Sequence, residues 1–243
     1  MSQTVKRAAS IIDSIATQPK TVAQLASEFG LHRSTMFREL QTLEEVGYAR
    51  RRIDGTYALA FRLVGLAQAS LDSLDLRQAC HDHVRRLHQL VGNTVHVAGL
   101  VDDAIIYVDK VEDASGVRMY SRIGSSVRPY CSAVGKSILA ELDTGRRDAI
   151  LAGTSWKRYT DTTITSRSAL NAELDTAAEQ GWAVDDGEFE DFVNCIAVPI
   201  RTSAGIVGAL SLTAIRMKQN LDQIKPRLPL LQRTALQIGR EMG

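Results

Sequence analysis

The run Gly135-Lys136-Ser137 has the residue types that end a phosphate-binding loop. Such a loop also needs a glycine five residues before the first of them, so that the backbone can wrap closely around a phosphate. Tyr130 occupies that position, and we therefore exclude a nucleotide-binding loop of this type. The helix predicted to begin near Ser132 offers another chemistry, because its free backbone N–H groups and positive dipole end can hold a carboxylate. An ordinary capped helix is the alternative interpretation.

Cys195 stands at the start of an apolar strand and could act as a nucleophile only with a base beside it. No histidine occurs in the last 147 residues, and the nearest one in the sequence is His96. A buried structural thiol is the alternative for Cys195. The sequence also lacks a GxSxG element, so no hydrolase site is indicated.

Histidines gather on one predicted helix, where His81, His83 and His88 follow Cys80. Residues 81 and 83 point roughly 200° apart on a helix, and residues 81 and 88 are about two turns apart. These spacings do not favour a shared metal ion. The three cysteines form no CxxC pair, which indicates neither a disulfide framework nor a structural zinc site. We expect no metal, no cofactor and no catalytic residue.

Basic residues are concentrated near the start of the chain, although its net charge is only +1. Residues 1–60 hold eight Lys/Arg against six Asp/Glu, and three of these cations are consecutive, Arg50-Arg51-Arg52. The whole chain of 243 residues is 44% hydrophobic and 23% charged, as is ordinary for a soluble protein. No stretch approaches the ~18 apolar residues of a membrane helix, and no signal peptide is recognisable. We expect a soluble, cytoplasmic protein with no membrane partner.

The elements that must position the basic residues are short helices and a hairpin. Apolar spacing predicts helices over 5–17, from Thr21 to Gly30, and from Arg33 to Gly47. Thr21 and Gln24 form a capping-box pattern at the start of the second helix. An Asp-Gly turn at 54–55 between two β-prone runs predicts a hairpin. Residues 1–60 are therefore expected to form a winged helix-turn-helix domain.

In a winged helix the third helix enters the major groove of DNA, and the hairpin lies along the backbone. Arginine can read guanine through two hydrogen bonds, and Ser or Thr can bond phosphates or bases. A packing unit with solvated cations is the alternative. The predicted DNA-binding residues are Thr21, Arg33, Ser34, Thr35, Phe37, Arg38, Gln41, Arg50, Arg51 and Arg52.

The remainder of the chain has an α+β pattern. A helix over 61–73, within a linker 61–75, carries an apolar stripe suited to pairing two chains. In the domain expected over 76–243, helices are predicted from Leu76 to Gly92 and over 132–142, 144–152 and 167–180. Strands are expected over 94–101, 104–111, 117–123, 183–186, 194–201 and 206–215. The closing helix over 220–241 should kink or start late at Pro226 and Pro229. Hairpin-linked strands between helices predict one antiparallel sheet covered by helices.

Motifs along the whole chain resemble the IclR-type bacterial transcriptional regulators. In the first domain the resemblance rests on residues 23–26 and on the run from Gly30 to Tyr48. In the second it rests on residues 128–140, 181–186, 195–200 and 208–213. The sequence departs from the family pattern in having Arg128 where proline is usual and Phe192 where glycine is usual.

The resemblance implies a GAF-like effector-binding domain, a homodimer or dimer of dimers, and operator DNA binding tuned by a small organic ligand. It also implies that Cys195 lines a ligand pocket. The carried-over effector-binding residues are Met119 from the third strand, Ala133, Val134, Asp185, Val193, Cys195, Ser211 and Thr213. The helix start within this set favours a carboxylate effector.

The function predicted is a ligand-responsive transcriptional regulator, a repressor of a catabolic operon. The alternative is a small enzyme, such as a hydrolase, fused to a nucleic-acid-binding module. The missing nucleophile–base spacing and metal motif favour the regulator.

Overall fold

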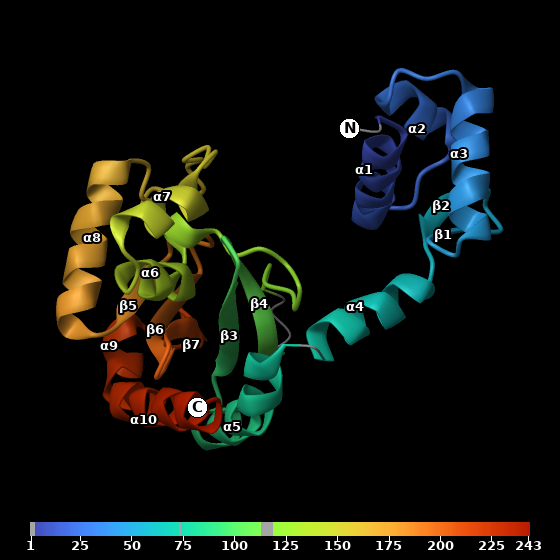
Figure 1. The fold of residues 1–243 in the computed structure, drawn as a ribbon. Coiled ribbons are helices and arrows are strands. Elements are labelled where there is room, and N and C mark those ends of the chain that lie inside the picture. The colour runs from blue at the N-terminus through green and yellow to red at the C-terminus, as the bar shows by residue number, and fades with distance from the viewer. Residues whose placement is uncertain (1–2, 73, 113–118) are drawn as a thin grey trace. The chain divides into compact units, whose positions relative to one another are not determined.

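The computed structural model describes residues 3–72, 74–112 and 119–243 (Figure 1). The chain divides into two compact units, Met1–Ser70 and Leu71–Gly243. The division falls inside the segment 61–75 that the sequence predicts to be a linker.

The first unit is a three-helix domain with a two-stranded hairpin. Its elements are α1 (Gln3–Thr17), α2 (Val22–Glu28), α3 (Arg33–Glu45), β1 (Ala49–Arg51) and β2 (Tyr57–Leu59). The helices meet in a small core to which α3 contributes Met36, Leu40 and Leu43, spaced along one helix face. Tyr57 of β2 is buried in the same core and exchanges backbone hydrogen bonds with Lys20. This pairing ties the hairpin to the chain that enters α2.

Helix α4 (Arg62–Asp72) starts directly after the hairpin. The guanidinium of Arg62 donates a hydrogen bond to the Val46 carbonyl (2.5 Å) and stacks over the Tyr48 ring. These contacts attach the first turn of α4 to the end of α3. Further along, Val64 and Leu66 are exposed.

The second unit contains a five-stranded antiparallel sheet. Its strands are β3 (Thr94–Val101), β4 (Ala104–Val111), β5 (Ala183–Asp186), β6 (Val193–Thr202) and β7 (Gly205–Ile215), and their order in the sheet is β4-β3-β7-β6-β5. Successive side chains of a strand point to opposite faces of a sheet, so each strand contributes to two different layers.

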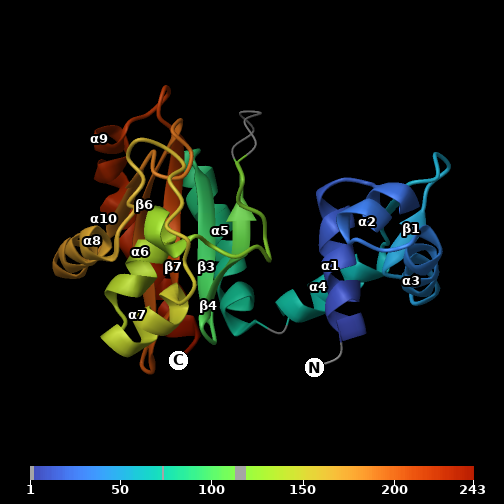
Figure 2. The ribbon, with the colours of Figure 1, turned by 90° about the horizontal axis from the view of Figure 1, so that it is seen from above.

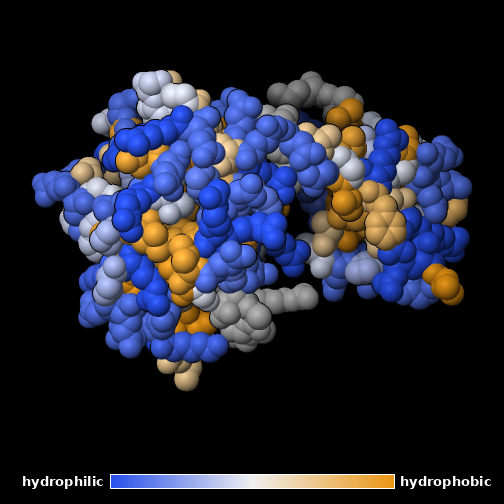
Figure 3. All heavy atoms as spheres, turned by 90° about the horizontal axis from the view of Figure 1, so that it is seen from below, coloured by the Kyte–Doolittle hydropathy of each residue, from blue (hydrophilic) through white to orange (hydrophobic). Residues whose placement is uncertain are grey.

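One face of the sheet is covered by α5 (Asp75–Val91) and α10 (Leu228–Glu241), as Figures 1 and 2 show. Leu210 and Leu212 of β7 and Ile196 of β6 belong to the apolar core under these helices. Seen from the side of α5 and α10, this unit has a mostly hydrophilic surface with a narrow apolar strip (Figure 3).

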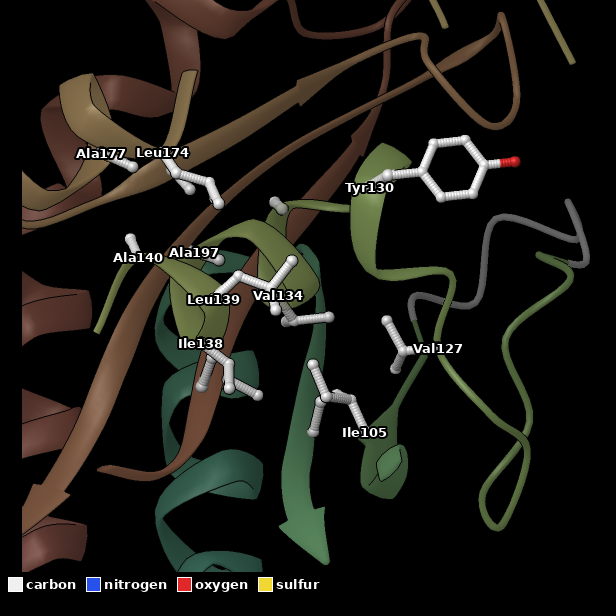
Figure 4. Packing of buried hydrophobic residues seen from close by; sticks show 14 of the residues in the cluster. Ile105, Val127, Tyr130, Val134, Ile138, Leu139, Ala140, Leu174, Ala177 and Ala197 are labelled. Carbon is white, nitrogen blue, oxygen red and sulfur yellow. The ribbon is translucent and has the colours of Figure 1, made fainter. Parts of the chain in front are cut away.

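The opposite face is covered by α6 (Ala133–Ala140), α7 (Thr144–Leu151) and α8 (Arg167–Gln180). Figure 4 shows Val134, Ile138 and Leu139 of α6 packed between the sheet and α8. The strands present small residues here, including Ala197 and Ala209, which let α6 approach closely.

The strand predicted over 117–123 is wrong for the residues described. Residues 119–123 have no strand structure, and residues 117–118 lie outside the described part of the chain. A turn closed by the Ser125 N–H and the Arg122 carbonyl, with Gly124 at a positive φ of 84°, interrupts the extended run. The free edge of β4 is bonded by residues 124–127 instead, for example from the Val127 N–H to the Ile105 carbonyl (2.8 Å).

The closing helix is interrupted at Pro226, and its long part, α10 (Leu228–Glu241), starts late, as predicted. Helix α9 (Leu221–Ile224) ends in a 3-10 turn, Lys225–Arg227, that contains Pro226. Pro229 lies in the first turn of α10, where its missing N–H breaks no helical hydrogen bond.

The start of α6 depends on Gly135, which packs against the short 3-10 helix Pro129–Cys131. A Cβ atom at residue 135 would lie 2.6 Å from the Pro129 Cα and 2.7 Å from the Ser132 Oγ. The glycine of the Gly-Lys-Ser run is therefore required by packing, and not by a phosphate.

We predict that Gly135→Ala lowers the free energy of unfolding by about 1–3 kcal/mol, because the added methyl group overpacks a backbone contact. Gly65→Ala is the matched control, since a Cβ there meets no atom within 4 Å and alanine favours a helix. Denaturant unfolding monitored by circular dichroism measures both. Equal stability of Gly135→Ala and the unmodified protein would contradict the packing role.

Candidate functional site

A polar face of α3 is directed away from the core of the first unit. Met36, Leu40 and Leu43 are buried, whereas the predicted DNA-binding residues around them are accessible. Thr35 is half-buried, and the exposed members on this helix are Arg33, Ser34, Phe37, Arg38 and Gln41. Helical periodicity thus separates the packing face of α3 from a face with two arginines.

Contacts at both neighbouring helices fix this face. The Thr21 hydroxyl accepts a hydrogen bond from the Gln24 N–H (3.3 Å), which completes the predicted capping box at α2. Arg7 of α1 forms an ion pair with Glu39 of α3. The His32 Nδ1 accepts weakly from the Ser34 N–H (3.4 Å) and caps α3. Thr21 therefore has a structural partner as well as a place at the start of α2.

The hairpin carries the three consecutive arginines, all exposed. In the strand register Arg50 faces Ala58 and Arg51 faces Tyr57. The backbone N–H of Arg51 donates to a Glu44 carboxylate oxygen (3.2 Å), a bond that does not use the guanidinium. Arg52 lies 3.9 Å from Asp54, a separation that gives little stability between exposed groups. The hairpin can therefore present its cations to a phosphate backbone.

A cavity of about 50 Å³, partly open to solvent, lies over the polar face of the sheet at the start of α6. This volume has room for a few water-sized groups. The sequence-predicted effector residues all line it, and they are Met119, Ala133, Val134, Asp185, Val193, Cys195, Ser211 and Thr213. Met119 reaches the cavity from a loop and not from a strand.

Strand register explains why the polar members of this set meet. Asp185 of β5 is opposite Cys195 of β6, which is opposite Thr213 of β7. Ser211 is opposite His96 of β3. These side chains form adjacent rows on one face of the sheet, although β3 lies far from the other three strands in the sequence.

Sequence reasoning missed nine further lining residues. Alternation of polar and apolar residues in 94–97 was a signal for His96, while the residues from loops had no periodic signal. The nine are His96, Tyr107, Tyr120, Ser121, Ser126, Arg128, Ser132, Phe189 and Glu190.

A chain of hydrogen bonds crosses the cavity floor. The two ring nitrogens of His96 bond the Ser121 Oγ (2.8 Å) and the Thr213 Oγ1 (3.2 Å), and that hydroxyl also contacts the Cys195 Sγ (3.2 Å). Burial, with the nearby charge of Lys110, lowers the pKa of His96 to about 3. Burial and the charge of Asp185 raise the pKa of Cys195 well above its ordinary value. A histidine does lie near Cys195, but the thiol stays protonated, so this arrangement favours binding over nucleophilic chemistry.

Asp185 is the buried carboxyl group of the cavity. Burial, together with the charge of Glu188, raises its pKa to about 7. Its Oδ1 accepts a hydrogen bond from the Glu188 N–H (2.8 Å). The Glu188 side chain in turn pairs with the fully buried ammonium of Lys136 (2.5 Å), which also bonds Glu173 of α8 (3.2 Å). This pair joins α6 to α8 and to the loop that follows Asp185.

The start of α6 has unused hydrogen-bond donors. Ser132 caps the helix by accepting from the Gly135 N–H (3.3 Å) and donating to the Arg128 carbonyl (2.8 Å). The N–H groups of Ala133 and Val134 have no acceptor among the described residues, and both residues line the cavity. Such groups at a helix N-terminus favour an anionic partner.

Two family profiles match the sequence. The profile of the IclR helix-turn-helix domain covers residues 4–52, and that of the bacterial transcriptional regulator IclR C-terminal domain covers residues 68–240. The chain belongs to the IclR family. Among IclR-family relatives, the HTH-type transcriptional regulator KdgR of Escherichia coli K12 is 34% identical over 91% of this chain and 85% of its own length. XynR of the same organism is 31% identical over 99% and 97%.

Solved structures agree with this assignment. The IclR structure from Thermotoga maritima matches with a TM-score of 0.80 and 30% identity, over 99% of this chain and 98% of the other. An IclR homolog from Microbacterium hydrocarbonoxydans, complexed with 4-hydroxybenzoate, matches with a TM-score of 0.82 and 24% identity over 99% of each chain. They confirm a helix-turn-helix domain followed by an α+β domain with an antiparallel sheet.

Membership of the IclR family decides between the two predicted functions. The relatives are transcriptional regulators with a DNA-binding domain, so this protein is a transcriptional regulator and not an enzyme. No helix in the part of the chain that the structure describes is long and apolar enough to cross a membrane.

The raised pKa of Asp185 predicts a pH-dependent stability. The ordinary pKa of an aspartate is near 4. The contribution of the protonated Asp185 carboxyl group to the free energy of unfolding is therefore fully present below about pH 4, and it is lost as the pH rises to about 7. Asp185→Asn keeps an acceptor for the Glu188 N–H and removes this loss. The stability of the variant relative to the unmodified protein should therefore rise across this window, by at most about 1.4 kcal/mol per pH unit.

Denaturant unfolding at about pH 5 and about pH 7.5 measures this difference. Asp186→Asn, at the exposed neighbouring residue, is the control and should keep the pH dependence of the unmodified protein. If the stability of Asp185→Asn changed with pH in the same way as that of the unmodified protein, Asp185 would not titrate in this window.

Proposed function

We propose that this IclR-family protein is a repressor of catabolic genes whose operator affinity is controlled by a small carboxylic acid bound in the cavity. The observation that carries the proposal is the cavity itself, which is lined by strand hydroxyl groups and by two residues of α6 whose N–H groups have no acceptor among the described residues. A repressor role is supported by the relative YiaJ of Escherichia coli K12, a DNA-binding transcriptional repressor that is 31% identical. The 4-hydroxybenzoate held by the Microbacterium homolog supports a carboxylate effector.

The DNA-reading surface in this proposal is the exposed face of α3. Arg33, Ser34 and Arg38, with Thr35, Phe37 and Gln41, enter the major groove, while Thr21 lies at the start of α2 beside the backbone. The hairpin arginines bind phosphates. Two copies read two half-sites, so the protein acts as a homodimer or a dimer of dimers. The exposed Val64 and Leu66 of α4 support pairing through that helix.

The effector in this proposal has its carboxylate on the N–H groups of Ala133 and Val134. Ser211, Thr213 and Asp185 bond its other polar groups. Its apolar part packs on the remaining members of the predicted set, which are Met119, Val193 and Cys195.

We predict that Arg38→Ala removes sequence-specific operator binding, because one lost bidentate contact costs about 1–3 kcal/mol and recurs in each half-site. Arg51→Ala is the matched comparison. It should weaken binding to every DNA sequence alike and reduce the salt dependence, as expected for a phosphate contact. Fluorescence anisotropy with operator and unrelated DNA at several salt concentrations separates the two effects. Unchanged operator affinity in Arg38→Ala would remove this residue from the reading surface.

Two changes test the carboxylate position. Ala133→Pro removes one N–H at the first helical residue, where proline is tolerated, and Thr144→Pro makes the same change in α7 away from the cavity. Ser211→Ala removes a hydroxyl worth roughly 0.5–1.5 kcal/mol if the effector satisfies it. Ala133→Pro and Ser211→Ala should raise the effector concentration needed to release operator DNA, and Thr144→Pro should not. If all three respond like the unmodified protein in calorimetric titrations, the effector binds elsewhere.

A further inference from the structure

Arg128 lies at the cavity within a group of aromatic rings. Its guanidinium carbon is 4.5 Å from the ring centres of Tyr120 and Phe189 and 5.3 Å from that of Tyr159. The Nε donates a hydrogen bond to the Tyr159 hydroxyl (2.8 Å), and an Nη donates to the Tyr120 hydroxyl (3.1 Å). The three rings also contact one another edge to face through Phe189. Neutral groups therefore hold this cation in one position.

The cation has no counter-ion among the described residues. Arg7, Arg167 and Arg201 each form an ion pair with a carboxylate, but Arg128 does not. Asp185 and Glu190 line the same cavity, yet neither forms an ion pair with Arg128. Its second Nη also has no acceptor in the described part of the chain. A positioned guanidinium with unused donors and no carboxylate beside it is suited to bind an anion.

Arg128 and the start of α6 lie at different depths. Ala133 and Val134 are 2% and 3% exposed, so the start of α6 is buried. Arg128 is half-buried, and Tyr120, which bonds it, is 55% exposed. The cavity thus has a positive group near its mouth and the positive end of a helix further inside.

We propose that Arg128 is a second anion-binding point and that the effector carries two anionic groups, as a dicarboxylic acid does. This inference rests on the proposed function, which places one carboxylate on the N–H groups of Ala133 and Val134. The second carboxylate takes the donors that Arg128 leaves unused. A monocarboxylate bound inside would leave the guanidinium without a counter-ion, so the two classes should differ in affinity.

The test compares matched acids on the full-length protein by isothermal titration calorimetry at constant ionic strength. Succinate, glutarate and adipate are compared with butanoate, pentanoate and hexanoate, which have the same carbon chains and one carboxylate less. The unmodified protein should bind at least one dicarboxylate about tenfold or more tightly than its matched monocarboxylate, the range of one charge-assisted pair.

Variants at Arg128 test whether this residue causes the preference for dicarboxylates. Arg128→Gln should abolish it by weakening the dicarboxylate about tenfold while leaving the monocarboxylate within about twofold. Arg128→Lys keeps the charge but loses the planar fork, and it should retain part of the preference. Arg146→Gln, at an exposed arginine of α7, is the control and should change neither affinity. Thermal unfolding checks that each variant folds. If Arg128→Gln does not fold, the test is made with Arg128→Lys alone.

The outcomes separate this inference from the proposed function. Equal losses for both classes of acid in Arg128→Gln would mean that Arg128 and α6 share one carboxylate, which overturns the inference and keeps the carboxylate effector. Unchanged binding of both classes would reduce Arg128 to a structural residue and also overturn it. Failure of both classes to bind the unmodified protein would overturn the carboxylate effector itself and this inference with it.

Discussion

The second unit depends on the alternation of side chains along β3, β6 and β7. One set, which includes Ile196, Leu210 and Leu212, is large and apolar and packs under α5 and α10. The other set is small or polar: Ala197 and Ala209 pack under α6, whereas Ser211 and Thr213 of β7 line the cavity. Because a strand has a period of two, the same short sequence both closes the core and leaves a polar floor. The cavity follows from this constraint.

The helix above that floor is held by two different kinds of contact. Gly135 permits a backbone approach that any side chain would prevent, and Lys136 pairs with the buried carboxylate of Glu188 and the partly exposed carboxylate of Glu173 on two neighbouring segments. Removing one partner of such a buried pair leaves an uncompensated charge, so the pair specifies the position of α6 strongly. The free N–H groups of Ala133 and Val134 therefore stay at one place over the strands. A fixed set of donors costs little to organise when a ligand arrives.

The chemistry inside the cavity is that of recognition. His96 and Cys195 are joined through Thr213, but burial keeps the imidazole neutral and the thiol protonated. A neutral network of this kind lines the cavity with hydroxyl groups and holds no reactive thiolate. In the first unit, by contrast, exposed charged groups lie on α3 and the hairpin. The hydrogen-bonding groups of the cavity and these exposed cations thus belong to separate units.

The sequence by itself determined the features that depend on interactions between residues close together in the chain. The capping box of Thr21 and Gln24, the helix start at Ser132 and the interruption at Pro226 all depend on neighbours within one helical turn, and the structure has each of them. The tertiary structure alone decided which distant segments meet. It placed His96 beside Thr213, brought the loop residues Tyr120, Arg128 and Phe189 together, and gave residues 119–123, expected to be part of a strand, no strand structure, with a turn at 122–125. Periodicity and capping are local properties, whereas a cavity is formed by strands and loops that pair across long stretches of chain.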